Sequence, residues 1–183
     1  VEMTDVEPDG RISDFDLGLW SDEQIPALKR IVDACHSYGA KVGIQIAHAG
    51  RKAEDAEVPV APSAIPFDEK SKLPRALSTQ EVKEMVEKFR GAVARAVKAG
   101  FDAIELHGAH GYLIHQFHSP LTNQRDDEYG KDLLKFGREV IQAAKAEMPE
   151  DMPLIMRISA KEYVEGGYDI QDSISFAKEY QQA

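Results

Sequence analysis

The sequence contains one cysteine, no long apolar run and fewer basic than acidic residues. A single Cys35 excludes an intramolecular disulfide and indicates a reducing compartment, which we expect to be the cytoplasm. A membrane-spanning helix needs roughly 18 consecutive apolar residues, and no stretch of the chain approaches that length. The 22 Lys and Arg against 32 Asp and Glu give a formal net charge of −10, which disfavours nucleic acid or an anionic membrane as the main partner.

Recognisable phosphate-binding and metal-binding motifs are also missing. There is neither a G-x-G-x-x-G nor a Walker sequence, so no recognisable loop in this stretch would hold the phosphate of a nucleotide cofactor. There is no H-E-x-x-H motif and no cysteine pair, and we expect no metal site. A metal-dependent hydrolase stays the weakest alternative, with its ligands drawn from His48, Glu105, His107, His110, His115 and His118.

The length of 183 residues suits one domain, 1–183, with a single sizeable core. Both ends look truncated, because the sequence starts without Met in an apparent strand and stops in an apparent helix at 175–183. No signal peptide is expected. We therefore expect the chain to be a piece of a longer one.

Strands and helices alternate along the sequence. Two helix starts carry a capping box, in which a Ser and a Gln or Glu three residues later satisfy free backbone N–H groups; these pairs are Ser21 with Gln24 and Ser78 with Glu81. Gly39 and Gly100 are expected to end these two helices. Further helices are predicted at 133–147 and from Gln171, and strands at 1–6, 41–48, 101–107 and 153–160.

This alternation predicts a parallel sheet with right-handed crossovers. Because the strands are short and apolar, we expect both faces of the sheet to be buried. The segment 49–77 has neither helical nor strand periodicity and is predicted to be a long functional loop. The segment 122–130 is expected to be a solvated, turn-rich cover in which Arg125 pairs with Asp126 or Asp127.

Polar residues gather where the predicted strands end. In parallel α/β folds the chemistry collects at the carboxyl ends of the strands, and the long loops of this chain also follow strands. The one-sided distribution predicts a site at this edge of the sheet. The residues concerned are Gln45, His48, Glu105, His107, Arg157 and Ser159.

His107 and His110 lie three residues apart, with Tyr112 close behind. Each histidine could be a buried ring satisfied by a backbone carbonyl. Alternatively, two imidazole N–H donors aimed at one oxygen would stabilise negative charge developing there. Tyr112 could be a core aromatic, or its hydroxyl could give a proton to a developing carbanion.

Arg157 interrupts the apolar run 154–158 and is expected to be buried, so its guanidinium needs an anionic or strongly accepting partner. A salt bridge to Glu105 or Glu2 is the structural alternative. Gln45, between Ile44 and Ile46, raises the same question, because an amide at a strand end can donate to and accept from the edge of a heterocycle.

Five stretches closely resemble the old yellow enzyme family, and most closely its bacterial ene-reductases related to NADPH dehydrogenase. The most specific elements are H-A-G-R-K at 48–52 and H-x-x-H-G-Y at 107–112. The resemblance spans nearly the whole chain, over 9–23, 43–53, 61–65, 99–130 and 154–160.

The resemblance implies a (β/α)8 TIM barrel with non-covalent FMN at its carboxyl face, of which this chain would cover about four βα units, roughly strands two to five. It implies that Gln45 and Arg157 contact the pyrimidine edge of the flavin and that the backbone of Met3 passes beside it. His107 would lie near the flavin as well.

The resemblance also implies the reaction. FMN would take a hydride from NADPH or NADH and deliver it to the activated C=C bond of an enone or enal. His107 and His110 would hold the carbonyl oxygen of this small-molecule substrate, and Tyr112 would supply the proton.

Measured against the family, parts of the pattern are absent. The stretch 130–140 is shorter than usual, and the first strand and the last three, which hold the FMN phosphate, are missing. A barrel needs closure to remove its sheet edges. The alternative reading is therefore a non-catalytic half-barrel that does not retain flavin, or that forms a homo-oligomer through its open edges.

Overall fold

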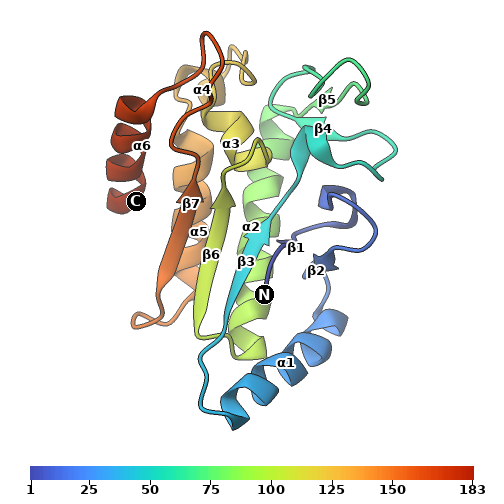
Figure 1. The fold of residues 1–183 in the computed structure, drawn as a ribbon, viewed down its shortest axis with the longest axis vertical. Helices are drawn as coiled ribbons and strands as arrows, with labels where there is room; N and C mark the ends of the chain where they lie inside the picture. The colour runs from blue at the N-terminus through green and yellow to red at the C-terminus, as the bar shows by residue number, and fades with distance from the viewer.

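The computed structural model describes residues 1–183 as a parallel sheet backed by helices (Figure 1). The five-stranded sheet has the order β2-β1-β3-β6-β7, and every neighbouring pair is parallel. Its strands are β1 (Thr4–Asp5), β2 (Leu17–Gly18), β3 (Gly43–Ala47), β6 (Ala103–Gly108) and β7 (Leu154–Ile158). The helices are α1 (Ile25–Ser37), α2 (Thr79–Ala99), α3 (Leu113–His118), α4 (Glu128–Lys131), α5 (Lys135–Glu147) and α6 (Ile170–Gln182). None of them combines the length and apolar composition needed to cross a membrane.

The predicted helix boundaries are confirmed where a local signal exists. Both capping boxes form, at Ser78 ahead of α2 and at Ser21 ahead of the short 3-10 turn that leads into α1. Gly100 ends α2 with φ 90°, and Gly39 follows α1 with φ 74°, both in the left-handed region that favours glycine. These termini depend on neighbouring residues only, so the sequence pattern is enough to locate them.

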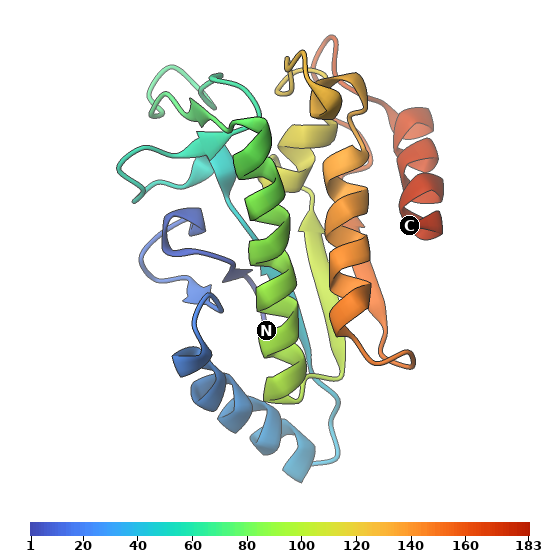
Figure 2. The same cartoon turned by 180° about the vertical axis from the view of Figure 1, so that it is seen from behind.

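Helices α2 and α5 cover one face of the sheet (Figure 2). Phe89 of α2 meets Phe136 of α5 edge to face, with ring centroids 6.2 Å apart, and both rings are fully buried. Ile104 and Leu106 of β6 point into the same core, which joins 28 buried residues in one cluster. The core therefore lies between the sheet and this pair of helices.

The expectation that both faces of the sheet are buried is wrong. No helix covers the face seen in Figure 1, and in β7 the residues alternate between half-buried and exposed. Ile155 is 49% exposed, and Arg157 on the same face of the strand is exposed as well. The apolar run 154–158 predicted a strand correctly, but which elements cover each face depends on the rest of the molecule.

Two segments expected to be loops contain regular structure. The long segment 49–77 holds a 3-10 turn, Gly50–Lys52, and a two-stranded parallel pair formed by β4 (Val60–Ala61) and β5 (Arg75–Ala76). The segment after β6 holds α3 and α4. All of these elements are short, and short elements leave no periodic pattern of the kind that sequence reasoning uses.

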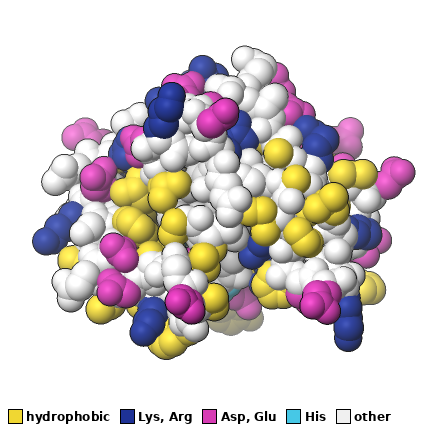
Figure 3. Space-filling view, turned by 90° about the horizontal axis from the view of Figure 1, so that it is seen from above, with side chains coloured by type: hydrophobic (Ala, Val, Ile, Leu, Met, Phe, Trp, Pro, Cys, Tyr) yellow, Lys and Arg dark blue, Asp and Glu magenta, His cyan; other side chains and the backbone are white.

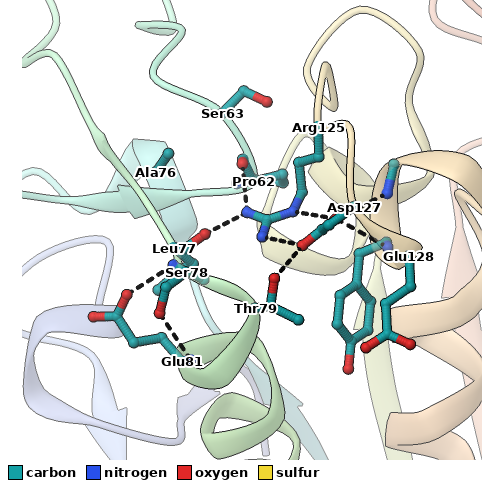
Figure 4. A network of polar contacts seen from close by, with 12 residues as sticks. Pro62, Ser63, Ala76, Leu77, Ser78, Thr79, Glu81, Arg125, Asp127 and Glu128 are labelled. Carbon is teal, nitrogen blue, oxygen red and sulfur yellow. Dashed lines mark hydrogen bonds and ion pairs between the residues drawn. The ribbon is translucent and has the colours of Figure 1, made fainter.

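The segment 122–130 is not a solvated cover, because Arg125 ties it to the long loop (Figure 4). The guanidinium pairs with Asp127, which is one of the two predicted partners. It also donates to the carbonyl oxygens of Pro62 and Leu77. Only 9% of the Arg125 side chain is exposed. Asp127 in turn accepts from Thr79 at 2.6 Å and from the first backbone N–H groups of α4.

The pKa of Asp127 lies far below its ordinary value, chiefly because of its hydrogen bond to Arg125. The Arg125–Asp127 network thus joins β4, the start of α2 and the start of α4 at the carboxyl edge of the sheet. A buried ion pair of this kind is costly to break on one side, because the remaining charge loses its partner.

We predict that Arg125→Ala lowers the free energy of unfolding by about 3–5 kcal/mol, since it leaves Asp127 and two carbonyl groups unpaired. Urea unfolding at neutral pH measures the change. Arg30→Ala is the matched control, because Arg30 is exposed on α1 and should change stability by less than about 0.5 kcal/mol. Equal effects of the two substitutions would contradict a structural role for the network.

Candidate active site

The register of the strands aligns the polar side chains in rows on the open face. Gln45 of β3 pairs with Glu105 of β6, which pairs with Ile155 of β7. Two residues further along, His107 of β6 pairs with Arg157 of β7. Side chains of paired residues in parallel strands point to the same side of the sheet. The fold therefore brings together the strand-end residues that the sequence pattern singled out.

The view onto the carboxyl ends of the strands shows what surrounds these rows (Figure 3). Lysine, arginine and acidic side chains are spread around the rim, with hydrophobic groups in patches between them. A groove of about 430 Å³ on the open face is lined by residues of three strands, among them Gln45, Glu105 and Arg157.

His107, His110 and Tyr112 form a cluster of three rings directly after β6. The ring of His107 lies 5.0 Å from that of His110 and 5.0 Å from that of Tyr112, both edge to face. The rings of His110 and Tyr112 are 6.4 Å apart. A sharp turn makes this possible, because His110 and Gly111 both adopt positive φ, 58° and 73°.

His107 is a neutral hydrogen-bond donor. Its Nδ1 accepts from the backbone N–H of Ala109 at 3.2 Å, so the ring proton of the neutral form lies on Nε2. Burial, followed by the nearby His110 and Arg157, lowers the pKa of His107 to about 4. At neutral pH the imidazole therefore offers one N–H and no charge.

His110 is exposed, and its backbone N–H donates to the hydroxyl of Ser159 at 3.0 Å, which joins the ends of β6 and β7. Desolvation, followed by Arg157, lowers the pKa of His110 as well. Burial, followed by the charges of Asp16 and Asp5, raises the pKa of Tyr112. The phenol therefore keeps its proton at neutral pH and can donate it.

Of the residues predicted to contact a flavin, Gln45 and Arg157 line the groove, whereas Met3 and His107 do not. Gln45 is buried, and its amide donates to Glu105, which fixes the side chain and leaves its carbonyl oxygen free to accept. Met3 precedes β1 and packs against the alanine cluster beside Tyr112. Arg157 was expected to be buried, but it is exposed because nothing in this chain covers the face to which it points. Neither Glu105 nor Glu2 forms the salt bridge with it that was the structural alternative.

This set of hydrogen-bond donors and acceptors fits the edge of a planar heterocycle such as the pyrimidine ring of a flavin. A guanidinium supplies several N–H donors, a fixed amide supplies an acceptor and a donor, and His107 supplies one further N–H. All three border one open groove or lie one row above it. The residues present thus fit FMN, although only for its ring system.

The other histidines are structural. His48 is buried, accepts from the N–H of Gly50 through Nδ1 and pairs through Nε2 with Glu7 at 2.7 Å. His115 and His118, named above only as possible metal ligands, pack in an aromatic cluster around Tyr168, and His118 bonds to the hydroxyl of Tyr180. No three His, Cys, Asp or Glu side chains are arranged to hold a metal ion.

Sequence reasoning missed two residues of this region. Lys52 donates to the carbonyl oxygen of His110 at 3.1 Å, and its ammonium lies 5.0 Å from the centre of the Tyr112 ring. Asp5, at the end of β1, is fully buried, and neither carboxylate oxygen has a hydrogen-bond partner. The available signal for Asp5 was an acid closing an apolar strand, the same rule that identified His107 and Arg157.

The chain is thus a parallel βα sheet with ring donors and a guanidinium at its carboxyl edge. The model of the NADH:flavin oxidoreductase / NADH oxidase family matches residues 1–183, and the chain belongs to this family. The predicted membership and the predicted barrel fold are confirmed. FMN, with NADH or NADPH as the reductant, is the cofactor set of the family.

The chain is similar to curated proteins over almost its whole length. It is 55% identical over 181 residues to an NADPH dehydrogenase of Listeria monocytogenes, covering 97% of this chain and 53% of that protein. An NADPH dehydrogenase of Bacillus subtilis is 51% identical over the same share of both chains. The chain thus spans about half the length of these relatives.

Solved structures agree with the fold. Morphinone reductase superposes with a TM-score of 0.87 at 30% identity, over 99% of this chain and 55% of that one. A structure of 2-naphthoyl-CoA reductase with 2-naphthoyl-CoA gives a TM-score of 0.93 at 26% identity, over 98% of this chain and 30% of that one.

We predict that stability falls with pH because of Asp5. Burial, followed by the charge of Asp16, raises the pKa of Asp5 to about 8, against 3.8 for a free side chain. Between these two values the folded chain keeps a proton that the unfolded chain releases, so the free energy of unfolding decreases as pH rises, by at most about 1.4 kcal/mol per pH unit.

Asp5→Asn should remove this decrease, which urea unfolding at several pH values between 5 and 9 can measure. Asp151→Asn, at an exposed carboxylate between α5 and β7, serves as the control and should follow the parent chain. If Asp5→Asn and the parent chain lose stability in parallel, the carboxyl of Asp5 is not the group responsible.

Proposed function

We propose that the chain is the substrate-binding half of an FMN-dependent oxidoreductase that takes a hydride from NADPH or NADH and reduces the activated C=C bond of α,β-unsaturated carbonyl compounds. The observation that supports this most is the cluster of His107, His110 and Tyr112, three proton-bearing rings beside the row that holds Arg157. Residues 1–183 would form one partial TIM-barrel domain around a single core. The single Cys35 fits a protein of the cytoplasm.

The histidine pair would bind the carbonyl oxygen of an enone or enal. His107 offers Nε2–H from a buried, neutral ring, and the ring of His110 lies 5.0 Å from it, edge to face. Two donors on one oxygen draw electron density from the conjugated C=C bond and stabilise the negative charge that forms on the oxygen when the β-carbon is reduced. Neutral imidazole rings suit this role, because they donate a hydrogen bond to the oxygen and keep the proton.

Tyr112 would protonate the α-carbon. Its raised pKa keeps the hydroxyl protonated, and the ammonium of Lys52 beside the ring partly compensates the negative charge left when the proton departs. The same lysine bonds to the carbonyl oxygen of His110, so it holds the turn that separates the two residues.

FMN supplies the hydride chemistry when it is bound. Gln45 and Arg157 would hold the pyrimidine edge of its ring, with the backbone of Met3 alongside. An exposed arginine without a carboxylate partner favours a negatively charged ring, because its own charge is not neutralised within the chain. The residues that would hold the phosphate are not expected in this chain.

A non-catalytic half-barrel is the second candidate, and two observations favour it. The chain spans 53% of its NADPH dehydrogenase relatives, and one face of its sheet is open. The strands β2 and β7 form the edges of the sheet, so copies of the chain could associate there as a homo-oligomer. In this reading the catalytic residues are present without flavin.

We predict that the 183-residue chain retains FMN after incubation and desalting, with a visible absorbance band that bleaches on addition of NADPH. The physical reason is the fixed donor set around the groove. A colourless chain after desalting would assign the flavin site, and hence the activity, to a longer polypeptide.

We predict that the double variant His107→Ala/His110→Ala binds a phenol-type ligand at least about tenfold more weakly, because two hydrogen bonds to its oxygen are lost. Alkene reduction should slow by about 10² or more. FMN absorbance after desalting should be retained. The control is His36→Ala, on the exposed side of α1; an unchanged ligand affinity in the double variant contradicts the donor-pair role.

A further inference from the structure

A second pocket, of about 320 Å³, lies beside the ring cluster and has the opposite charge to the rest of the chain. It is formed by the 3-10 turn Gly50–Lys52 and the segment 67–72 of the long loop. Four cations and two carboxylates line it, a local net charge of +2 in a chain of net charge −10. The cations are Arg51, Lys52, Lys70 and Lys72, and the carboxylates are Glu54 and Asp68.

The cations are oriented by carbonyl oxygens rather than neutralised by carboxylates. Arg51 donates to the carbonyls of Ile65 and Pro66 at 3.3 and 3.0 Å. Lys72 donates to the carbonyls of Glu54 and Ala56 at 2.8 and 2.7 Å. A carbonyl dipole fixes the position of a cation and leaves its unit charge in place. The pocket therefore presents a preorganised positive field.

The surroundings of these cations favour an anionic ligand. The Nε of Arg51 is buried without a hydrogen-bond partner. Desolvation, followed by repulsion from Arg51, lowers the pKa of Lys52. Asp68 accepts from the hydroxyl of Ser71 and the backbone N–H of Lys70 through Oδ1 and forms no ion pair with the cations. An anionic ligand in the pocket would offset the desolvation and mutual repulsion of Arg51 and Lys52.

An aromatic ring forms part of the wall. Phe67 lines the pocket and is 49% exposed. The ammonium of Lys52 lies 4.6 Å from its ring centre and the guanidinium carbon of Arg51 lies 5.6 Å away. An exposed ring next to cations suits a ligand that combines a phosphate with a planar base, because a base can stack on the ring.

Lys52 connects this pocket to the proposed catalytic cluster. It lines the pocket, and its ammonium also donates to the carbonyl oxygen of His110 and lies over the ring of Tyr112. A ligand that reaches the ring cluster with one end can therefore reach the pocket with the other.

We propose that this pocket binds a phosphate group of the reduced nicotinamide dinucleotide and that Lys70 and Lys72 select for it. The identity of the nucleotide rests on the proposed function, whereas the affinity for a phosphorylated nucleoside does not. The phosphate comes from one of two sources, the pyrophosphate bridge or the 2′-phosphate of the adenosine. Arg51 and Lys52 orient it, and Phe67 stacks on the adenine.

Calorimetric titration of the flavin-free 183-residue chain tests the proposal, with adenosine 2′,5′-bisphosphate, adenosine 5′-diphosphate and inorganic phosphate as separate ligands. We expect at least one nucleotide to bind more tightly than phosphate, and Lys70→Ala/Lys72→Ala to weaken it tenfold or more. Both lysines are exposed. Because Lys72 also donates to the carbonyl oxygens of Glu54 and Ala56, urea unfolding of the double variant checks that the fold is kept. Lys131→Ala/Lys178→Ala removes the same charge elsewhere on the surface and is the matched control.

Tighter binding of the 2′,5′-bisphosphate assigns the pocket to the 2′-phosphate, and tighter binding of the diphosphate assigns it to the pyrophosphate. Equal affinity for inorganic phosphate and both nucleotides overturns the proposal, as does an equal effect of the two double variants. Retention of FMN is measured separately. If the chain retains no FMN but still binds the nucleotide, the proposed reaction is contradicted and the proposal for this pocket is supported.

Discussion

The period-two alternation of side chains along parallel strands is the constraint on which the whole structure depends. Ile44, Ile46, Ile104 and Leu106 point toward α2 and α5 and are almost completely buried. The residues between and beyond them, Gln45, Glu105 and His107, point to the open face. The same five or six residues of a strand thus provide both the core and the site. A shift of one residue in register would exchange the two sets, so packing of the core also fixes the geometry of the site.

The electrostatics of the site depend on positively charged side chains that have no ion-pair partner. Arg157 lies in one row with His107 and lowers the pKa of both histidines, after desolvation as the larger cause. The charge of the arginine therefore helps to keep both imidazoles neutral. Near the carboxyl edge this acidic chain has positive charge without an ion-pair partner, in Arg157 and in the pocket that Lys52 lines.

Two contacts keep the long loop in place above the sheet. The Arg125–Asp127 network joins it to α2 and α4, and Gln116 of α3 holds the turn at Gly50, where a Cβ would lie 2.4 Å from the side-chain oxygen of Gln116. The Nε2 of Gln116 also donates to the carbonyl oxygen of Ala49 at 3.1 Å. Because the loop carries Arg51, Lys52 and Phe67, these buried contacts position the pocket as well. The loop is thus an extension of the folded core.

The sequence by itself determined the features that depend on neighbouring residues: the capping boxes at Ser21 and Ser78, the left-handed glycines Gly39 and Gly100, and the strand and helix order of a barrel segment. It also identified His107, His110 and Tyr112, because strand ends are recognisable from pattern. Only the tertiary structure decided that Arg157 is exposed, that Arg125 is buried, and that Asp5 and Lys52 belong to the site. Burial and charge pairing join residues far apart in the chain, and a local pattern carries no record of which elements will cover them.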